Sequence, residues 1–380
     1  MRNKVVVGLG LGAFLFLFSA TPLRASEETV GTVYTMTNAL PGNAVLVFNR
    51  NDDGGLAAGG TFSTGGLGSG GREPDFGLGN AGALALSEDE QLLFVVNPGS
   101  DDVSLFAVTK KGLQLLDRVS SGGRQPISVT VHERLVYVLN AGGNVGGSDN
   151  ISGFVVSPHG RLSPLNGSTR PLSAAVTSPA EIRFSPDGDV LVVTEKATNI
   201  IDTYTVAKDG RPTGPRVVPS DAETPFGFDF GDHNQVFISD DFNDEIGRGA
   251  LSSYRVARDG SLHLVSSKVP AHLSGACWVV VSADGRFAYL ANTVDSMISL
   301  YRIAAFDGSV KLVTSFASAS NPTDMYFSRD GRFLYELRPD QNGQSSPGIN
   351  VFRVHPGDGS LVALPGVSGL PKSVDGLAAR

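Results

Sequence analysis

Residues 178–210 read SPAEIRFSPDGDVLVVTEKATNIIDTYTVAKDG, and this stretch decides the fold. It contains three short runs, at 181–184, 190–194 and 200–206, that are rich in apolar and β-branched residues and alternate in polarity. Runs of this length and period predict β-strands. An Asp-Gly pair at 187–188 separates the first two runs, and such a pair between strands is a strong hairpin signal. The stretch therefore predicts an antiparallel meander.

The same pattern recurs along the chain. Comparable strand–turn–strand segments begin near residues 82, 125, 224, 275 and 321, and a further strand follows each of them. The second strands end at equivalent positions that are separated by roughly 45–55 residues, a spacing typical of propeller blades. These positions are Asn97, Asn140, Glu195, Asp240, Asn292 and Arg338.

The two ends of the chain share the remaining blade. Segments 33–38 and 44–54 supply a second and a third strand, while segment 373–379 resembles the first strand at 80–86 and has no partner after it. If these segments pair, no open sheet edge remains there. The sequence thus predicts an all-β, seven-bladed β-propeller that is closed by pairing of the C-terminal strand with the N-terminal blade.

Composition and the first 25 residues restrict the class of protein. The chain has 380 residues, of which 41% are hydrophobic, and a net charge of −8, which disfavours nucleic acid and anionic membranes as partners. Residues 1–25 combine a basic start, an apolar run and Ala25, as signal peptides do; an uncleaved anchor is the alternative. We expect cleavage near Ala25, export to the periplasm or the medium, and a monomeric propeller domain over 26–380 with no membrane span after processing.

Turn lengths distinguish the two faces of the predicted ring. The turns between first and second strands (185–188, 282–285, 328–331) and between third and fourth strands (208–210, 258–260, 357–359) are short and belong to one face. The long connections, at 63–82, 141–150, 241–250 and 339–348, belong to the other. Long loops on a rigid scaffold usually carry function, so we expect the site on the second face.

Two rings of side chains are predicted to surround the channel mouth on that face. The first ring comes from the inner strands and comprises Asp375, Ala83, Ser128, Glu181, Gly227, Trp278 and Asp324. The second comprises the six strand ends named above, with Lys196 and Asp241 adjacent. Equivalent positions differ sharply in polarity from blade to blade, as expected of a site built on a repeated scaffold.

The rings predict acid–base chemistry. Several carboxylates in a partly dry cleft cannot all ionise freely, so one of them should have a raised pKa and could activate water. The candidate catalytic residues are Glu181, Glu195 and Asp240. The candidate substrate-binding residues are Lys196, Arg248, Trp278, Asp324, Arg338, Asn140 and Asn292, of which the three cations could hold a carboxylate or an oxyanion. Alternatively, these polar groups only hold water and backbone amides in the channel.

No cofactor or resident metal is predicted with certainty. Ca²⁺ at the acidic ring is the one candidate, because carboxylate oxygens are its ligands, although no contiguous calcium loop is present. No cluster of Cys and His suggests zinc. The single cysteine, Cys277, lies inside a predicted strand, and we interpret it as a small buried hydrophobic residue.

Several segments resemble a known family. QPISVTV (125–131), TPFGFDF (224–230) and ACWVVVSADGRFAYLAN (276–292) are similar to the seven-bladed propeller lactonases, which include bacterial phosphogluconolactonases and fungal carboxymuconate cyclases, and most of all to a secreted bacterial branch. The resemblance covers roughly residues 30–379. It implies a carboxylic ester hydrolase that opens lactones, or a cycloisomerase.

Two functional hypotheses therefore stand. The first is an exported lactonase-like hydrolase or cycloisomerase whose substrate is a small lactone or carboxylate, with carboxylate-assisted attack of water at the channel mouth. The second is a binding propeller of the cell envelope without enzymatic activity. The inner-strand starts Pro126-Ile127-Ser128 and Pro179-Ala180-Glu181 lack the histidine that family members with assigned catalytic residues commonly carry there, which favours the second hypothesis.

Overall fold

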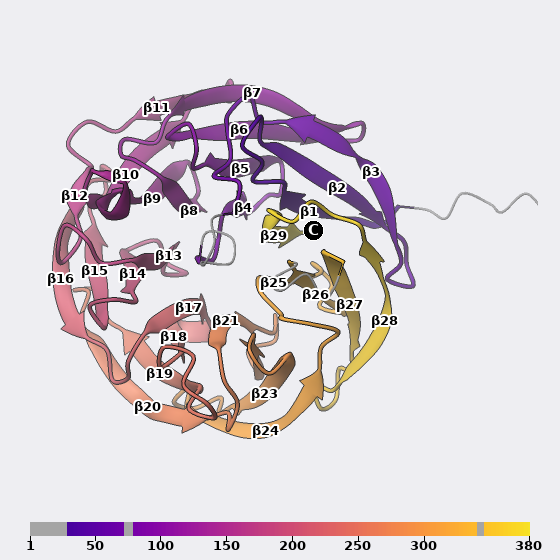
Figure 1. Ribbon diagram of the computed structural model, residues 1–380. Helices are drawn as coiled ribbons and strands as arrows, with labels where there is room; N and C mark the ends of the chain where they lie inside the picture. The colour runs from indigo at the N-terminus through magenta and orange to yellow at the C-terminus, as the bar shows by residue number, and fades with distance from the viewer. Residues whose placement is uncertain (1–28, 72–78, 340–345) are drawn as a thin grey trace, which may run out of the picture.

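The computed structural model describes residues 29–71, 79–339 and 346–380. The predicted signal peptide, part of the glycine-rich connection at 63–82 and part of the 339–348 connection lie outside these residues. Across the described part of the chain, antiparallel sheets form a ring of seven blades around a central axis (Figure 1). The prediction of a seven-bladed all-β propeller is confirmed.

Each blade runs outward from an innermost strand. The innermost strands are β29 (Asp375–Ala379), β4 (Leu84–Leu86), β8 (Pro126–His132), β13 (Pro179–Phe184), β17 (Pro225–Phe230), β21 (Ala276–Val281) and β25 (Met325–Phe327). The second strands are β1 (Gly31–Met36), β5 (Leu92–Asn97), β9 (Leu135–Ala141), β14 (Val190–Glu195), β18 (Gln235–Asp240), β22 (Phe287–Asn292) and β26 (Phe333–Arg338).

The third and outer strands complete the blades. The third strands are β2 (Ala44–Arg50), β6 (Asp102–Thr109), β10 (Asp149–Val156), β15 (Ile200–Val206), β19 (Ala250–Val256), β23 (Met297–Ile303) and β27 (Gly348–Val354). The outer strands are β3 (Leu56–Ser63), β7 (Gly112–Ser120), β11 (Leu162–Pro164) with β12 (Arg170–Pro171), β16 (Pro212–Pro219), β20 (Leu262–Pro270), β24 (Val310–Ala317) and β28 (Leu361–Ser368). Two short 3-10 turns, η1 (Gly142–Val145) and η2 (Asp232–Asn234), occur in connections.

The ring is closed as the sequence predicts. Strand β29 pairs antiparallel with β1, with Val33 opposite Ala379 and Tyr34 opposite Ala378 (Figure 1). The backbone of Thr32 also exchanges hydrogen bonds of 3.1 and 2.9 Å with that of Arg380. The innermost strand of this blade therefore comes from the C-terminal end of the chain, while its other three strands come from the N-terminal end.

Register places the two kinds of connection on opposite faces. In the blade built by residues 178–219, Pro179 lies opposite Glu195, while Phe184 lies opposite Leu191 beside the turn at 185–189. In that turn the Ser185 hydroxyl donates to Asp187 at 2.6 Å, and Gly188 adopts a φ of +72°, which only glycine adopts at little cost. The inner strand thus begins, and the second strand ends, on the face that carries the long connections. We call this face the loop face.

Burial explains why the second strands are almost continuously apolar. The side chains on both faces of a second strand pack against neighbouring blades, and strands such as β14 and β22 are buried at every position. The outer strands, such as β16 and β20, are exposed or partly exposed at all but one position, since they lie at the rim of the ring. No helix within the described ranges is long and apolar enough to cross a membrane.

Candidate functional site

The predicted strand-end residues lie inside the blades. Apart from Arg338, which is partly exposed, their side chains are fully buried, and each makes hydrogen bonds to a neighbouring strand or connection. Asp240 accepts a hydrogen bond of 2.5 Å from the Ser252 hydroxyl, and Glu195 accepts one of the same length from Ser173. The fully buried set is Asn97, Asn140, Glu195, Asp240 and Asn292. Their predicted roles stay predictions, and none of them lines the pocket described next.

The residue after each strand end points the other way, because successive side chains of a strand alternate between its faces. Ala141, Lys196, Asp241 and Thr293 hold these positions, and all four line a pocket of about 530 Å³ on the loop face. We call this the loop-face pocket. The inner strands and the residues before them supply its other wall through Gln125, Ile127, Ser178, Pro179, Thr224, Phe226, Cys277 and Trp278. Of the predicted substrate-binding residues, Lys196 and Trp278 lie here.

Asp241 is the carboxylate best placed for acid–base chemistry. Its residue is only 5% exposed, and the backbone N–H of Asp244 donates to its Oδ2 at 3.2 Å. Burial, followed by the negative charge of Asp244, raises the pKa of Asp241 to about 7. A carboxyl that titrates near neutral pH can both accept and return a proton.

Lys196 lies against an aromatic wall of the same pocket. Its ammonium stands 4.6 Å from the centre of the Phe226 ring and donates to the carbonyl oxygen of Gly79. Phe226 packs against Trp278 with the ring centres 5.1 Å apart, and the Trp278 indole N–H donates to the Asn80 carbonyl at 2.8 Å. Both rings are therefore held in fixed orientations beside the acidic group.

Cys277 touches the acidic end of the pocket. Its thiol lies 3.8 Å from Asp241 Oδ1, and burial, together with the charge of Asp241, raises its pKa well above the usual value. The thiol therefore stays protonated at neutral pH and is a poor nucleophile. Asp241, Asp244 and Cys277 bring ligand-type atoms within 4.8 Å of one another. Only the two carboxylates suit Ca²⁺, which prefers oxygen ligands, so calcium at the acidic residues stays a prediction.

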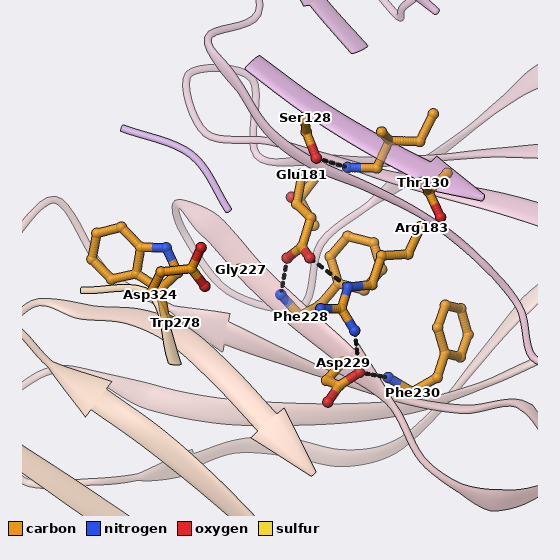
Figure 2. A network of polar contacts seen from close by, with 12 residues as sticks. Ser128, Thr130, Glu181, Arg183, Gly227, Phe228, Asp229, Phe230, Trp278 and Asp324 are labelled. Atoms are coloured by element: carbon orange, nitrogen blue, oxygen red, sulfur yellow. Dashed lines mark hydrogen bonds and ion pairs between the residues drawn. The ribbon is translucent and has the colours of Figure 1, made fainter. Parts of the chain in front are cut away.

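A second polar network links inner strands around the channel (Figure 2). Glu181, which is 1% exposed, accepts hydrogen bonds from Arg183 Nε at 2.6 Å and from the backbone N–H of Phe228 at 2.7 Å. Arg183 also contacts the carboxylate of Asp229. Burial raises the pKa of Glu181, and the Arg183 charge acts in the opposite direction. Glu181 and Arg183 also line a groove of about 390 Å³ on the face with the short turns.

The network follows one rule around the channel. A polar side chain on an inner strand, or directly before it, accepts a hydrogen bond from a backbone N–H in the inner strand of the next blade. The pairs are Ser128 with Ile182, Glu181 with Phe228, Asp229 with Val281, and Asp324 with Leu377. These bonds join neighbouring blades, so the residues have a structural role whatever chemistry they support.

The two predicted rings contain the carboxylates of Glu181, Asp324, Asp375, Glu195 and Asp240, and the structure divides these five groups between the channel and the interiors of two blades. Burial and the charges of Glu181 and Asp375 raise the pKa of Asp324 well above its usual value, so these three groups do act on one another. Glu195 lies apart from them, inside its blade. There burial, followed by the hydrogen bond and charge of Glu195, raises the pKa of Asp202 to about 8.

The two predicted arginines lie outside the loop-face pocket. Arg248 pairs with Glu245 at 2.6 Å, packs over the Phe242 ring and lines a neighbouring groove of about 360 Å³. Arg338 donates to Asn350 at 2.9 Å, to the Ser346 carbonyl and to the Ser368 hydroxyl. That these arginines bind an anion stays a prediction, and neither of them lines the loop-face pocket.

Among the pocket residues without an assignment from the sequence are Gln125, Thr224, Phe226 and Asp244, which supply polar or aromatic side chains. Asp244 lies in a connection, and Phe226 looks like an ordinary strand residue. Gln125 and Thr224 precede inner strands and adopt left-handed backbone angles, with φ of +51° and +55°. Both backbone N–H groups are held from neighbouring turns, at 2.7 Å, by the side chains of Asp101 and Asn199 respectively. Nothing in a single sequence signals such a left-handed position.

Fold and pocket together define a β-propeller with an acid–base group at the mouth of its loop face. The chain belongs to the family described as lactonase, 7-bladed beta-propeller, whose profile matches residues 31–169 and 262–374. A 6-phosphogluconolactonase of Pectobacterium atrosepticum is 21% identical over 290 residues, which cover 73% of this chain and 81% of the relative. The structure of a periplasmic gluconolactonase from Pseudomonas aeruginosa superposes with a TM-score of 0.72 at 19% identity, covering 90% of this chain and 98% of that one. The resemblance inferred from the sequence is thus confirmed.

We expect the Glu181→Gln substitution to lower the free energy of unfolding by about 1–3 kcal/mol, because it weakens a buried, charge-assisted hydrogen bond between blades. Urea denaturation of the purified protein measures this effect. Glu133→Gln, at an exposed position on the face with the short turns, is the matched control and should change nothing. Unchanged stability of Glu181→Gln would contradict the structural role. A loss of activity without a loss of folded protein would instead support Glu181 as a base.

Proposed function

We propose that this protein is a lactone hydrolase whose reaction takes place in the loop-face pocket, with Asp241 as the general base. The observation that carries the proposal is a buried carboxyl with a pKa of about 7 in the wall of a pocket of about 530 Å³. Membership of the lactonase family supports the reaction class. The names of the relatives support lactones as substrates.

The proposed chemistry needs one group that moves a proton in both directions. The ionised Asp241 takes a proton from a water molecule while the water oxygen attacks the lactone carbonyl carbon. The tetrahedral intermediate then breaks the bond between that carbon and the ring oxygen. The proton held on Asp241 passes to the leaving ring oxygen, so the product is an open hydroxy acid and the carboxylate is regenerated.

Lys196 supplies the charge that this intermediate requires. Its ammonium lines the same pocket as the Asp241 carboxyl. A cation held near the developing oxyanion lowers the barrier by stabilising the charge of the transition state. The aromatic contact with Phe226 fixes the position of Lys196 before substrate arrives.

We further propose that the protein works outside the cytoplasm. The basic and apolar character of residues 1–25 supports this, and so does the periplasmic location in the description of the Pseudomonas aeruginosa relative. A direct check is to express the full chain in a bacterial host, fractionate the cells and determine the N-terminal sequence of the exported product, which we expect to begin near Ser26.

The test of the hydrolase is acid release, measured in a pH-stat with protein that starts at Ser26. Sugar, aryl and aliphatic lactones should be compared, each with added Ca²⁺ and with chelator. We expect acid release proportional to protein for at least one lactone class. If no lactone is opened in either metal condition, the hydrolase proposal fails, and the binding propeller becomes the better hypothesis.

A further inference from the structure

The outer strand of one blade is interrupted. It consists of the short strands β11 and β12, and a tight turn lies between them (Figure 1). The backbone N–H of Ser168 donates to the Leu165 carbonyl at 3.1 Å, which leaves Asn166 and Gly167 at the two central positions of the turn. Gly167 has a φ of +77°, a conformation that favours glycine, and both central residues are exposed.

These two residues carry the groups that react when an asparagine deamidates. In that reaction the backbone nitrogen of the following residue attacks the side-chain amide carbon, and glycine leaves this nitrogen least hindered because it has no side chain. Within the described part of the chain, neither the Asn166 side chain nor the Gly167 N–H has a hydrogen-bond partner. Both groups are free to react, and the chain already holds them close together, which favours an intramolecular reaction.

Arg211 contacts the peptide group that takes part in this reaction. Its Nε donates to the Asn166 carbonyl oxygen at 2.9 Å, while its Nη1 is held by the Asp209 carboxylate at 2.6 Å. The Asn166 carbonyl and the Gly167 nitrogen belong to one peptide group, so a negative charge formed on the nitrogen is shared with that oxygen. A guanidinium group hydrogen-bonded to the oxygen stabilises this charge. Arg211 is therefore placed to make the Gly167 N–H more acidic.

From these contacts we propose that Asn166 is a site of spontaneous deamidation and that Arg211 promotes the reaction. Hydroxide takes the proton of the Gly167 N–H, and the nitrogen then attacks the side-chain amide carbon of Asn166. The bond from that carbon to the amide nitrogen breaks, and ammonia leaves with a proton from water. Water opens the resulting cyclic imide at either carbonyl and gives aspartate or isoaspartate. The inference is independent of the proposed function.

The products change both the charge and the length of the turn. Arg170, on β12, donates to the Gly167 carbonyl at 2.9 Å, so two guanidinium groups contact the turn that acquires the new carboxylate. Nearby positive charge favours the ionised form of a carboxyl group. Isoaspartate also inserts an additional carbon atom into the backbone between β11 and β12. The modified protein is therefore separable from the original by its charge.

The test is to incubate the purified protein and to follow each asparagine by proteolytic digestion and mass spectrometry. We expect Asn166 to convert at a rate that rises with pH, because the Gly167 N–H must lose its proton. Asn243 is also exposed but precedes Asp244, so it is the reference site in the same sample and should change far more slowly. If Asn166 stays intact in the folded protein while it converts in the urea-denatured chain, the proposed site is wrong.

Arg211→Gln is the informative variant, because it removes a positive charge at an exposed position. It should slow the conversion of Asn166 several-fold in the folded protein and leave the rate unchanged in urea, where the contact is lost. Arg216→Gln, at an exposed position of the adjacent strand β16, is the matched control and should not alter the rate. An equal or faster conversion in folded Arg211→Gln overturns the role of Arg211, as does an equal slowing by Arg216→Gln.

Discussion

The Asp241→Asn protein is expected to lose at least a hundredfold in kcat/KM toward the lactone that the wild type opens, while its fold stays intact. General-base catalysis typically contributes factors of about 10²–10⁴, and asparagine keeps the size of the side chain but accepts no proton. In the wild type, kcat/KM should rise with pH through about 7, because only the ionised Asp241 takes a proton from water. This limb of the pH profile should be absent from the variant.

The neighbouring residue supplies an unusually close control. Asp240 is fully buried, accepts a hydrogen bond from Ser252, and has its pKa raised to about 8, with burial as the main cause. It is therefore mostly protonated at pH 7, and asparagine mimics the neutral acid. We expect Asp240→Asn to keep activity within about threefold. The reverse pattern, with Asp240→Asn inactive and Asp241→Asn active, would overturn the proposed base and restore Asp240 as the candidate.

The protein is expected to be markedly more stable near pH 5 than at pH 8. Burial raises the pKa of Asp202 and Asp240 to about 8 and that of Asp241 and Glu336 to about 7. In the unfolded chain the same groups titrate near 4. The folded state therefore binds more protons than the unfolded state between about pH 4 and pH 8, and stability falls as pH rises through that window.

The size of this effect is set by the number of groups. Each contributes up to about 1.4 kcal/mol per pH unit between its two pKa values, so the upper limit of the total from pH 5 to pH 8 is on the order of 10 kcal/mol. The melting temperature should fall on the order of 10 °C over this range. Below pH 4 the trend reverses, because hydrogen bonds from Ser185 and Asn234 outweigh burial and hold the pKa of Asp187 below its usual value.

Thermal melts at pH 5, 6, 7 and 8 in buffers of equal ionic strength check this expectation. The double variant Asp202→Asn, Asp240→Asn removes two of the titrating groups and should flatten the profile. Asp307→Asn, at an exposed turn, should leave its slope unchanged. A wild-type melting temperature that stays constant or rises from pH 5 to pH 8 would show that these buried carboxyls titrate normally.

The repeated strand pattern was sufficient to predict the fold, because the strands carry a period-two signal and many of the hairpins, such as those at 187–188, 284–285 and 330–331, contain an Asp-Gly turn. The same regularity even located the ring closure between 373–379 and the N-terminal blade. The face assignment followed from turn lengths alone. None of these inferences required knowledge of where an individual side chain points.

The residues of the site depend on the direction in which each side chain points. The end of each second strand could be located, but whether a side chain at that end points into the blade or into the mouth changes with every residue. The predicted base Asp240 consequently lies inside its blade, while Asp241 lines the pocket. The hydrogen-bond partner of Glu181 could not be predicted from the sequence either. The backbone N–H of Phe228 belongs to the next blade and reaches Glu181 only in the assembled ring.

The pairing of β29 with β1 sets the order in which the molecule can be completed. The innermost strand of one blade consists of residues 375–379, so the ring cannot close until these residues have been synthesised, long after β1. Until then β1 exposes an unpaired edge that can recruit a foreign strand. A chain that crosses a membrane unfolded and folds after its full length has arrived avoids this hazard, because the closing strand is then present from the first moment of folding. The late closure of the ring is thus compatible with the proposed export of the protein as an unfolded chain.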